Sequence, residues 1–170
     1  MLNAVAHPER IASLFLLAPV GLGDGISGEF TDAFQYRQDS DKLLSLLQTL
    51  VHRPQMISRQ IVPVLQQYLE REGVRSNLEI IARSLATANL QMQSCIAELA
   101  DSAMLANDLV SVVWGEQDKI IPRRSVAVQQ LPARWHILGE CGHMPHIEHR
   151  SRVSSLLLDS LSRQGRQGIT

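Results

Sequence analysis

The sequence lacks the features that mark several classes of protein. It has only two cysteines, Cys95 and Cys141, which are too few for a disulfide framework, and no cysteine and histidine cluster has zinc spacing. No apolar run reaches the roughly 18 residues of a membrane-spanning helix. The N-terminus lacks the basic, apolar and small-residue segments of a signal peptide. We therefore expect a cytoplasmic protein with no metal site and no membrane partner.

An excess of charge of one sign is also missing. The 16 Lys and Arg residues nearly balance the 17 Asp and Glu residues, for a formal net charge of −1 at pH 7. The one adjacent basic pair, Arg123 and Arg124, is too short to follow a phosphate backbone. We therefore expect no nucleic-acid partner. What is present is an ordinary globular composition, 45% hydrophobic and 19% charged, in 170 residues, the length of one domain.

Three short, mainly apolar runs predict β-strands. They are Ile11–Ala18, Leu109–Trp114 and Arg134–Leu138. The first run fits a strand that is covered on both faces, as in a parallel sheet. Helical patterns separate and follow the runs, and strands that alternate with helices indicate a parallel sheet. The predicted fold class is therefore α/β.

The long interval between the first two predicted strands has a helical pattern. From about residue 29 to residue 105, apolar side chains recur at helical spacing, most clearly over Leu43–Val51 and Ile61–Leu69. Most of these apolar residues are typical of plain packing surface. Further helical patterns cover Met1–Ala6, Ser125–Leu131 and Ser151–Ser162. We divide the chain into a partial core, residues 1–21 and 106–170, and a helical insertion, residues 22–105.

Two polar segments follow the second and third predicted strands. The segment 114–118 (WGEQD) ends in Asp118, and the segment 142–148 (GHMPHIE) contains His143. Because functional groups gather at the carboxyl ends of parallel strands, we expect these two side chains to lie close together. An acid followed by a histidine is the order of the last two members of one type of catalytic triad. His143 would take and return a proton, and Asp118 would accept a hydrogen bond from its other ring nitrogen.

Other interpretations of this acid and histidine stay open. Asp118 also suits a turn, and His143 could be a structural loop residue. Asp101 and Asp108 are rival acids, but they precede the strand and would point to the opposite sheet edge. We expect Glu116 to face solvent.

The residues around His143 have simpler interpretations. Cys141 is interpreted as a small buried thiol, because two residues are too few for a thiol and an imidazole to share a substrate. Glu148 is interpreted as an acid near a helix N-terminus, where the helix dipole favours negative charge. His146 and His149 could bind a metal, but the acidic or cysteine partner at fixed spacing is missing.

The sequence contains no Gly-x-Ser-x-Gly nucleophile motif. The segment 25–29 (GISGE) is a near match, but its last residue is wrong and it follows the wrong strand, so we reject it. The helical pattern at Met1–Ala6 has no capping residue before it, an unlikely place for a domain to begin. We therefore expect a C-terminal fragment whose nucleophile lies upstream of Met1, and we predict that the 170-residue chain alone is inactive.

These segments together resemble the α/β-hydrolase family. The shared features are W-G-x-x-D-x-I-x-P at 114–122, C-G-H-x-P-x-x-E at 141–148, and the link at 7–10 that leads into the first strand. The resemblance implies the C-terminal portion of an α/β-hydrolase fold, with its last three parallel strands, flanking helices and a helical cap at 22–105. In this family the loop at 21–23 (GLG) approaches the substrate pocket, although a tight turn is an equal interpretation.

Within this family, the segments 18–23 (APVGLG), 30–34 (FTDAF) and 59–74 resemble the hydrolase-like domain of the dihydrolipoamide acetyltransferase component of acetoin dehydrogenase. The resemblance implies a hydrolase or acyltransferase that acts on a small-molecule acyl substrate through a serine ester. It implies no cofactor in this chain, although a lipoyl group is possible on an upstream domain. The alternative is a non-catalytic docking module, and possible partners are dehydrogenase complex subunits or a second copy of the chain.

Overall fold

The fold is that of a computed structural model, which describes residues 1–20, 22, 26–32, 39–74, 76–81, 84, 109–122, 131 and 133–167. Its elements in chain order are α1 (Leu2–Ala6), η1 (Pro8–Arg10), β1 (Leu14–Leu17), α2 (Gly28–Asp32), α3 (Ser40–Thr49), η3 (Pro54–Met56), α4 (Ile61–Leu69), β2 (Val110–Gly115), β3 (Arg134–Leu138), α8 (Pro145–Glu148) and α9 (Arg150–Gln167). The elements η1 and η3 are short 3₁₀ turns.

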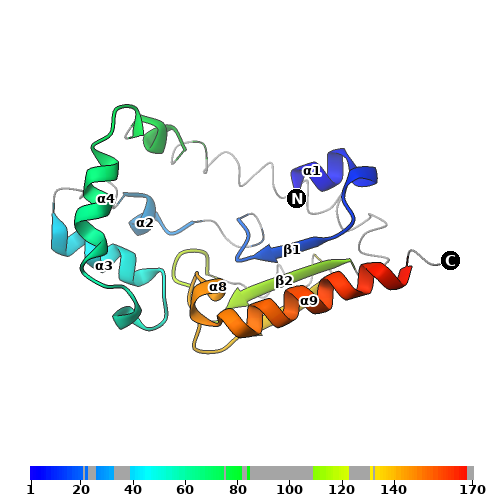
Figure 1. The fold of residues 1–170 in the computed structure, drawn as a ribbon. Helices are drawn as coiled ribbons and strands as arrows, with labels where there is room; N and C mark the ends of the chain where they lie inside the picture. Colours follow the sequence, from blue (N-terminus) through cyan, green and yellow to red (C-terminus); the bar gives the residue numbers. More distant parts are fainter. Residues whose placement is uncertain are drawn as a thin grey trace.

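The strands form one parallel sheet in the order β1-β2-β3. Leu16 lies opposite Val112, and Val112 lies opposite Trp135. Figure 1 shows β1 and β2 pointing the same way, towards α8 and the group formed by α2, α3 and α4, while α9 runs back along the sheet. The carboxyl ends of the strands therefore share one edge, and the loops that leave it meet there.

The central strand, β2, is buried at every position. Because side chains alternate along a strand, its two faces support two separate cores. On one face, Val112 and Trp114 pack in a cluster with Ala4 of α1. On the other face, Val113 packs with Val153 and Leu156 of α9. The strand is thus held from both sides, and this fixes the position of the loop that follows it.

The sequence predicts β2 and β3 well and β1 only in part. The bounds of β3 are as predicted, and β2 is displaced by one residue. The prediction that residues 11–18 form a strand covered on both faces was wrong in its extent and in its burial. The strand begins at Leu14, whose N–H donates to Leu109 at 2.9 Å, and Leu17 is 37% exposed. Within the described residues β1 has a neighbour on one side only, so less of it is covered.

The helices α3 and α4 lie where the apolar spacing predicts them. The Asp39 carboxylate caps α3 by accepting from the backbone N–H groups of Asp41 and Lys42. Leu43 of α3 packs against Val62 of α4. The last helix, α9, is longer than the predicted Ser151–Ser162. Residues 85–105 of the predicted helical insertion, and residues 125–130 of the helix predicted at Ser125–Leu131, lie outside the described residues. No helix that the structure describes is long and apolar enough to cross a membrane.

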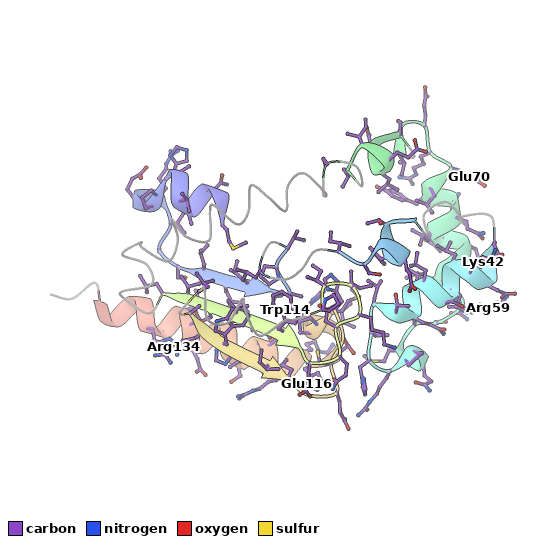
Figure 2. All side chains as sticks on the ribbon, turned by 180° about the vertical axis from the view of Figure 1, so that it is seen from behind. Lys42, Arg59, Glu70, Trp114, Glu116 and Arg134 are labelled. Atoms are coloured by element: carbon purple, nitrogen blue, oxygen red, sulfur yellow. The ribbon has the colours of Figure 1, made fainter. Side chains whose placement is uncertain are left out.

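The two tryptophans of the chain stack inside the sheet layer. The ring centroids of Trp114 and Trp135 are 6.1 Å apart. The indole N–H of Trp114 donates to the Ile121 carbonyl at 3.2 Å, and that of Trp135 donates to the Leu131 carbonyl at 2.9 Å. Figure 2 shows Trp114 within the sheet and Glu116 at the end of the same strand. The bond to Ile121 ties the loop after β2 to the core beneath it.

Candidate active site

Asp118 lies in the loop that leaves the carboxyl end of β2. Its Oδ1 accepts from the backbone N–H groups of Ile120 at 2.8 Å and Ile121 at 2.9 Å. Its side chain is fully buried. A carboxylate that is held by two backbone donors has a fixed orientation, so its second oxygen, Oδ2, points in one defined direction.

His143 lies in the loop that follows β3 and meets Asp118, as the sequence predicts. The distance from His143 Nδ1 to Asp118 Oδ2 is 2.9 Å. The His143 backbone N–H donates to the Leu50 carbonyl at 2.8 Å, which fastens this loop to the end of α3. The imidazole is 25% exposed, and no described residue forms a hydrogen bond with Nε2.

This bond selects one tautomer of the His143 ring. An ionised carboxylate can only accept, so Nδ1 carries the proton that is shared with Asp118. The neutral ring then presents Nε2 as an acceptor, and Nε2 is the atom that stays open. The arrangement can take a proton from a hydroxyl at Nε2, and the buried carboxylate would stabilise the resulting imidazolium.

Two glycines let the loops approach this closely. A Cβ added to Gly115 would clash with the Gly142 carbonyl oxygen. A Cβ added to Gly142 would lie 2.8 Å from the His52 nitrogen and 2.9 Å from the Leu50 oxygen. All three of these contacts are with backbone atoms, which have little freedom to move away. The end of β2, the His143 loop and the segment after α3 are thus in direct backbone contact.

Glu148 lies in the first turn of α8, as expected of a helix N-terminal acid, and its contacts extend beyond that turn. Its Oε1 accepts from Gly142 N–H at 2.8 Å and from Met144 N–H at 3.4 Å. Its Oε2 accepts from His52 N–H at 2.6 Å, across 96 residues of sequence. The sequence contained no signal for this long-range contact, although the short spacing from Gly142 to Glu148 is typical of a carboxylate that caps its own loop.

Cys141 is a buried thiol, as predicted, and its surroundings do not activate it as a nucleophile. It is 0% exposed, and Sγ lies 3.8 Å from Glu148 Oε1. Burial, and after it the Glu148 carboxylate, raises the pKa of the Cys141 thiol to about 12. The reactive form of cysteine is the thiolate, so this environment suppresses its reactivity.

The other candidates lie away from the Asp118–His143 pair or outside the described residues. Glu116 is exposed, as expected, and accepts a bond from the Gln117 amide. His146 is exposed, and Nε2 of His149 lies 3.1 Å from the Glu140 carbonyl. Asp101 and Asp108 lie outside the described residues. Within the described ranges, no three His, Cys, Asp or Glu side chains come together as a metal site would require.

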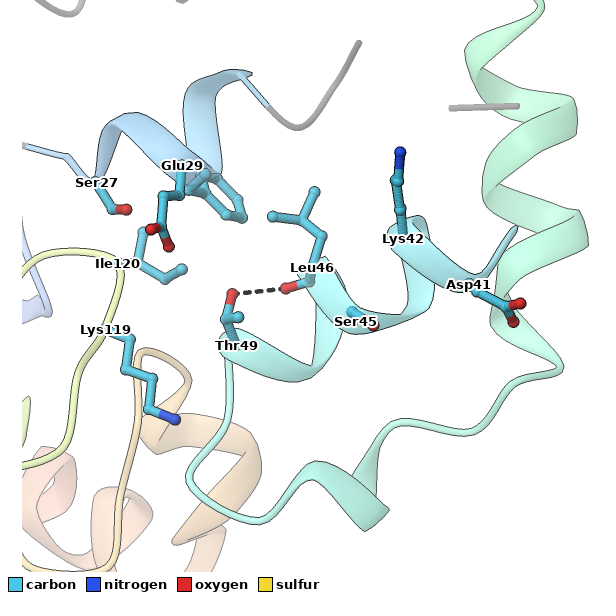
Figure 3. A pocket seen from close by; sticks show the side chains of 10 residues that line it. Ser27, Glu29, Asp41, Lys42, Ser45, Leu46, Thr49, Lys119 and Ile120 are labelled. Atoms are coloured by element: carbon cyan, nitrogen blue, oxygen red, sulfur yellow. Dashed lines mark hydrogen bonds between the residues drawn. The ribbon is translucent and has the colours of Figure 1, made fainter. Parts of the chain in front are cut away.

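A pocket of about 520 Å³ lies beside the loop that carries Asp118, although neither Asp118 nor His143 lines it. Its walls come from α2, from α3 and from Lys119 and Ile120, the two residues that follow Asp118. Figure 3 shows Lys119 and Ile120 on one side of the pocket and Leu46 and Thr49 of α3 on another. Of the 21–23 loop, which could either line a pocket or form a turn, the structure describes only Leu22, and Leu22 is buried in the core cluster. The pocket-lining role of Lys119 was not predicted.

Solved structures with the same architecture identify the fold. The chain superposes on 2-hydroxy-6-oxo-6-phenylhexa-2,4-dienoate hydrolase from Rhodococcus sp. strain RHA1 with a TM-score of 0.79 and 22% identity, covering 95% of this chain and 59% of that one. A variant of a meta-cleavage product hydrolase gives a TM-score of 0.76 and 17% identity over the same shares. The chain has the α/β-hydrolase fold, of which it forms a C-terminal portion.

Curated relatives point to the same fold. The dihydrolipoyllysine-residue acetyltransferase component of the acetoin cleaving system of Cupriavidus necator is 30% identical over 91% of this chain and 40% of its own length. The 2-hydroxymuconate semialdehyde hydrolase of Pseudomonas putida is 27% identical over 94% of this chain and 57% of its own. No family model matches the chain. The chain thus spans between two fifths and three fifths of these relatives.

Proposed function

We propose that Asp118 and His143 are the acid and base of a serine-dependent hydrolase or acyltransferase. The observation that carries the proposal is the 2.9 Å bond between Nδ1 and the buried carboxylate, with Nε2 free of hydrogen bonds from the described residues. In the reaction, Nε2 removes the proton from an attacking hydroxyl, and the imidazolium that forms returns it to the leaving group. Asp118 stays ionised throughout and keeps the ring oriented.

The attacking serine, in this proposal, is not one of the 170 residues. The chain contains no Gly-x-Ser-x-Gly, and the near match at 25–29 ends in the wrong residue. A complete site also needs donors for the oxyanion that forms during acyl transfer. The 170-residue chain by itself is therefore expected to be inactive, and the complete enzyme is expected to include an upstream segment that carries the nucleophile.

The proposed substrate is a small acyl compound, and the proposed cap is the helical segment 22–105. Relatives that are named as hydrolases of 2-hydroxymuconate semialdehyde and of 2-hydroxy-6-oxo acids support a hydrolytic reaction. The relative that is named as an acetyltransferase component supports transfer of the acyl group to an acceptor other than water. The pocket between α2, α3 and Lys119 is large enough for a small organic substrate.

A second candidate function is a docking module in a dehydrogenase complex. The specific observation that favours it is the 30% identity to a component of the acetoin cleaving system. It predicts that the reading frame begins at Met1 and that substitution of His143 changes nothing but local stability. An in-frame Gly-x-Ser-x-Gly upstream of Met1 would contradict it.

The test compares the 170-residue chain with the protein translated from any in-frame sequence that precedes Met1. A fluorophosphonate probe is expected to label a serine of the longer protein and none of the shorter one. His143→Ala is expected to abolish both labelling and hydrolysis of p-nitrophenyl acetate. His146→Ala is the matched control, because it removes an exposed imidazole only three residues away. Labelling of a serine within the 170 residues, or full activity without His143, would overturn the proposal.

A further inference from the structure

Glu148 accepts from three backbone N–H groups in two segments around the candidate base, His143. Its Oε1 accepts from the residues on both sides of His143, Gly142 at 2.8 Å and Met144 at 3.4 Å. Its Oε2 accepts from His52 at 2.6 Å. His52 lies just after α3, in the segment whose Leu50 carbonyl accepts the His143 N–H. One carboxylate therefore holds the His143 loop against the end of α3.

We infer that Glu148 is a positioning residue that keeps His143 in register with Asp118, and this inference rests on the proposed function. The ring of His143 can meet Oδ2 of Asp118 only if its backbone is fixed, since Asp118 is itself held by Ile120 and Ile121. The His143 N–H bond to Leu50 supplies one anchor. Glu148 supplies the others, because it satisfies the donors before and after His143.

The same contact makes α3 part of the site. Leu46 and Thr49 of α3 line the pocket, and the chain continues from Thr49 to the Leu50 carbonyl and the His52 N–H. A displacement of α3 would therefore pull on Glu148 and on the His143 loop together. Gly142 packs so closely on this segment that an added Cβ would lie 2.8 Å from backbone atoms of Val51 and His52, so the two backbones are expected to move together.

The carboxylate is needed for its two oxygens as well as for its charge. In Glu148→Gln only one oxygen remains, and the amide NH₂ faces a backbone N–H on whichever side it lies. In Glu148→Asp the charge stays but the side chain is one methylene shorter, so it cannot reach the donors of both segments. Both substitutions are expected to loosen the loop. Because Glu148→Asp keeps the charge, its effect reports the loss of geometry alone.

The experiment reads the His143 ring and two backbone amides in the purified protein by NMR. In the unaltered protein the ring nitrogens of His143 are expected to report the Nδ1–H tautomer. Glu148→Gln and Glu148→Asp are each expected to lower that population. They are also expected to accelerate hydrogen exchange at Gly142 and His52 about tenfold or more, the effect of losing one buried hydrogen bond. A simple loss of stability elsewhere would not change the tautomer.

Glu140→Gln is the matched control. Glu140 pairs with Arg53 at 2.7 Å and so joins the same two segments, but both side chains are exposed. Its loss is expected to leave the His143 tautomer unchanged. If Glu148→Asp leaves both the tautomer and the exchange rates unchanged, or if the His52 amide exchanges freely in the unaltered protein, the inference is overturned.

Asp118→Asn distinguishes this inference from the proposed function. If Asp118→Asn leaves the His143 tautomer unchanged, the proposed acid–base pair fails, and amide exchange at His52 alone then decides whether Glu148 fixes the loop. If Asp118→Asn changes the tautomer and neither Glu148 variant does, the pair stands and the positioning role of Glu148 fails.

Discussion

Asp118 and Glu148 are two carboxylates that use the same backbone chemistry for different ends. Each accepts from backbone N–H groups, two for Asp118 and three for Glu148. Asp118 receives both backbone bonds on Oδ1 and keeps Oδ2 for His143. Glu148 uses both oxygens for backbone donors, and its contact with the Cys141 thiol falls on the oxygen that also accepts from Gly142.

In the proposed function, this difference separates a reactive carboxylate, Asp118, from a structural one, Glu148. Both are held in place by the backbone, but only Asp118 has an oxygen in reserve for a group that changes protonation. Asp118 is buried and Glu148 is half-buried, and both carboxylates accept from backbone N–H groups. The number of oxygens left for the imidazole, and not the count of hydrogen bonds, marks the candidate acid.

Under the proposed function, the largest expected effect is on catalysis by the longer protein that would supply the serine. Asp118→Asn keeps an oxygen for Ile120 and Ile121 but turns an NH₂ group towards His143, which forces the wrong ring tautomer. We expect kcat/KM for an ester substrate to fall by about 10⁴-fold. Unfolding in urea should change little. Glu116→Gln is the control, because Glu116 lies in the same loop but is exposed. Equal losses of kcat/KM in the two variants would contradict the comparison between Asp118 and Glu148.

The next effect is on stability, at the glycines where the two loops touch. Gly142→Ala places a methyl group within 3 Å of backbone atoms of Leu50, Val51 and His52, and we expect it to cost about 3 kcal/mol of unfolding free energy. Gly28→Ala is the matched control, because a Cβ there meets nothing within 4 Å. Urea titrations of the two variants give the comparison, and similar midpoints would show that the loops have room to separate.

A smaller effect should distinguish the two carboxylates by stability alone. Glu148→Gln leaves a buried donor without an acceptor, and we expect a loss of about 2 kcal/mol. Asp118→Asn keeps its two backbone bonds, and we expect it to lose less. Thermal or urea unfolding measures both. If Asp118→Asn proves the more destabilising change, the division into a reactive and a structural carboxylate is wrong.

The smallest effect concerns the reactivity of Cys141. Burial and Glu148 raise its thiol pKa to about 12, and Asp118 is the weakest of the causes. At pH 8 roughly one thiol in 10⁴ would then be ionised, so iodoacetamide should react slowly and should accelerate as the pH rises towards 12. In a Cys95→Ser background, Glu148→Gln should lower this pKa more than Asp118→Asn does. Equal pH profiles for the two variants would contradict this ordering.

The sequence was sufficient to predict that Asp118 and His143 lie together, because each follows a strand with a clear pattern. Asp118 comes three residues after Gly115, and His143 comes five after Leu138. Parallel pairing then brings the two loops to one edge without further information. The prediction of β1 was weaker. Residues 11–13 are as apolar as many strand residues, but pairing depends on the position of β2, which a local pattern does not contain.

Glu148 shows the limit of what local sequence patterns can predict. Its place at a helix N-terminus could be predicted, and its bond to Met144 belongs to that turn. Its bond to His52 depends on how the segment after α3 packs against the loop after β3. Nothing in the spacing of residues 50–52 signals that packing. The same holds for Lys119, whose place in the pocket wall depends on where α2 and α3 lie.

The stacked indoles of Trp114 and Trp135 provide a fluorescence signal in solution that reports on the sheet alone. They are the only two tryptophans in the chain, and both lie on strands of the sheet. Intrinsic fluorescence therefore reports the melting of β2 and β3, while far-ultraviolet circular dichroism also senses α3 and α4. Two coincident curves would mean that the helical segment and the sheet melt as a single cooperative unit, and two separate curves would mean that each has its own transition.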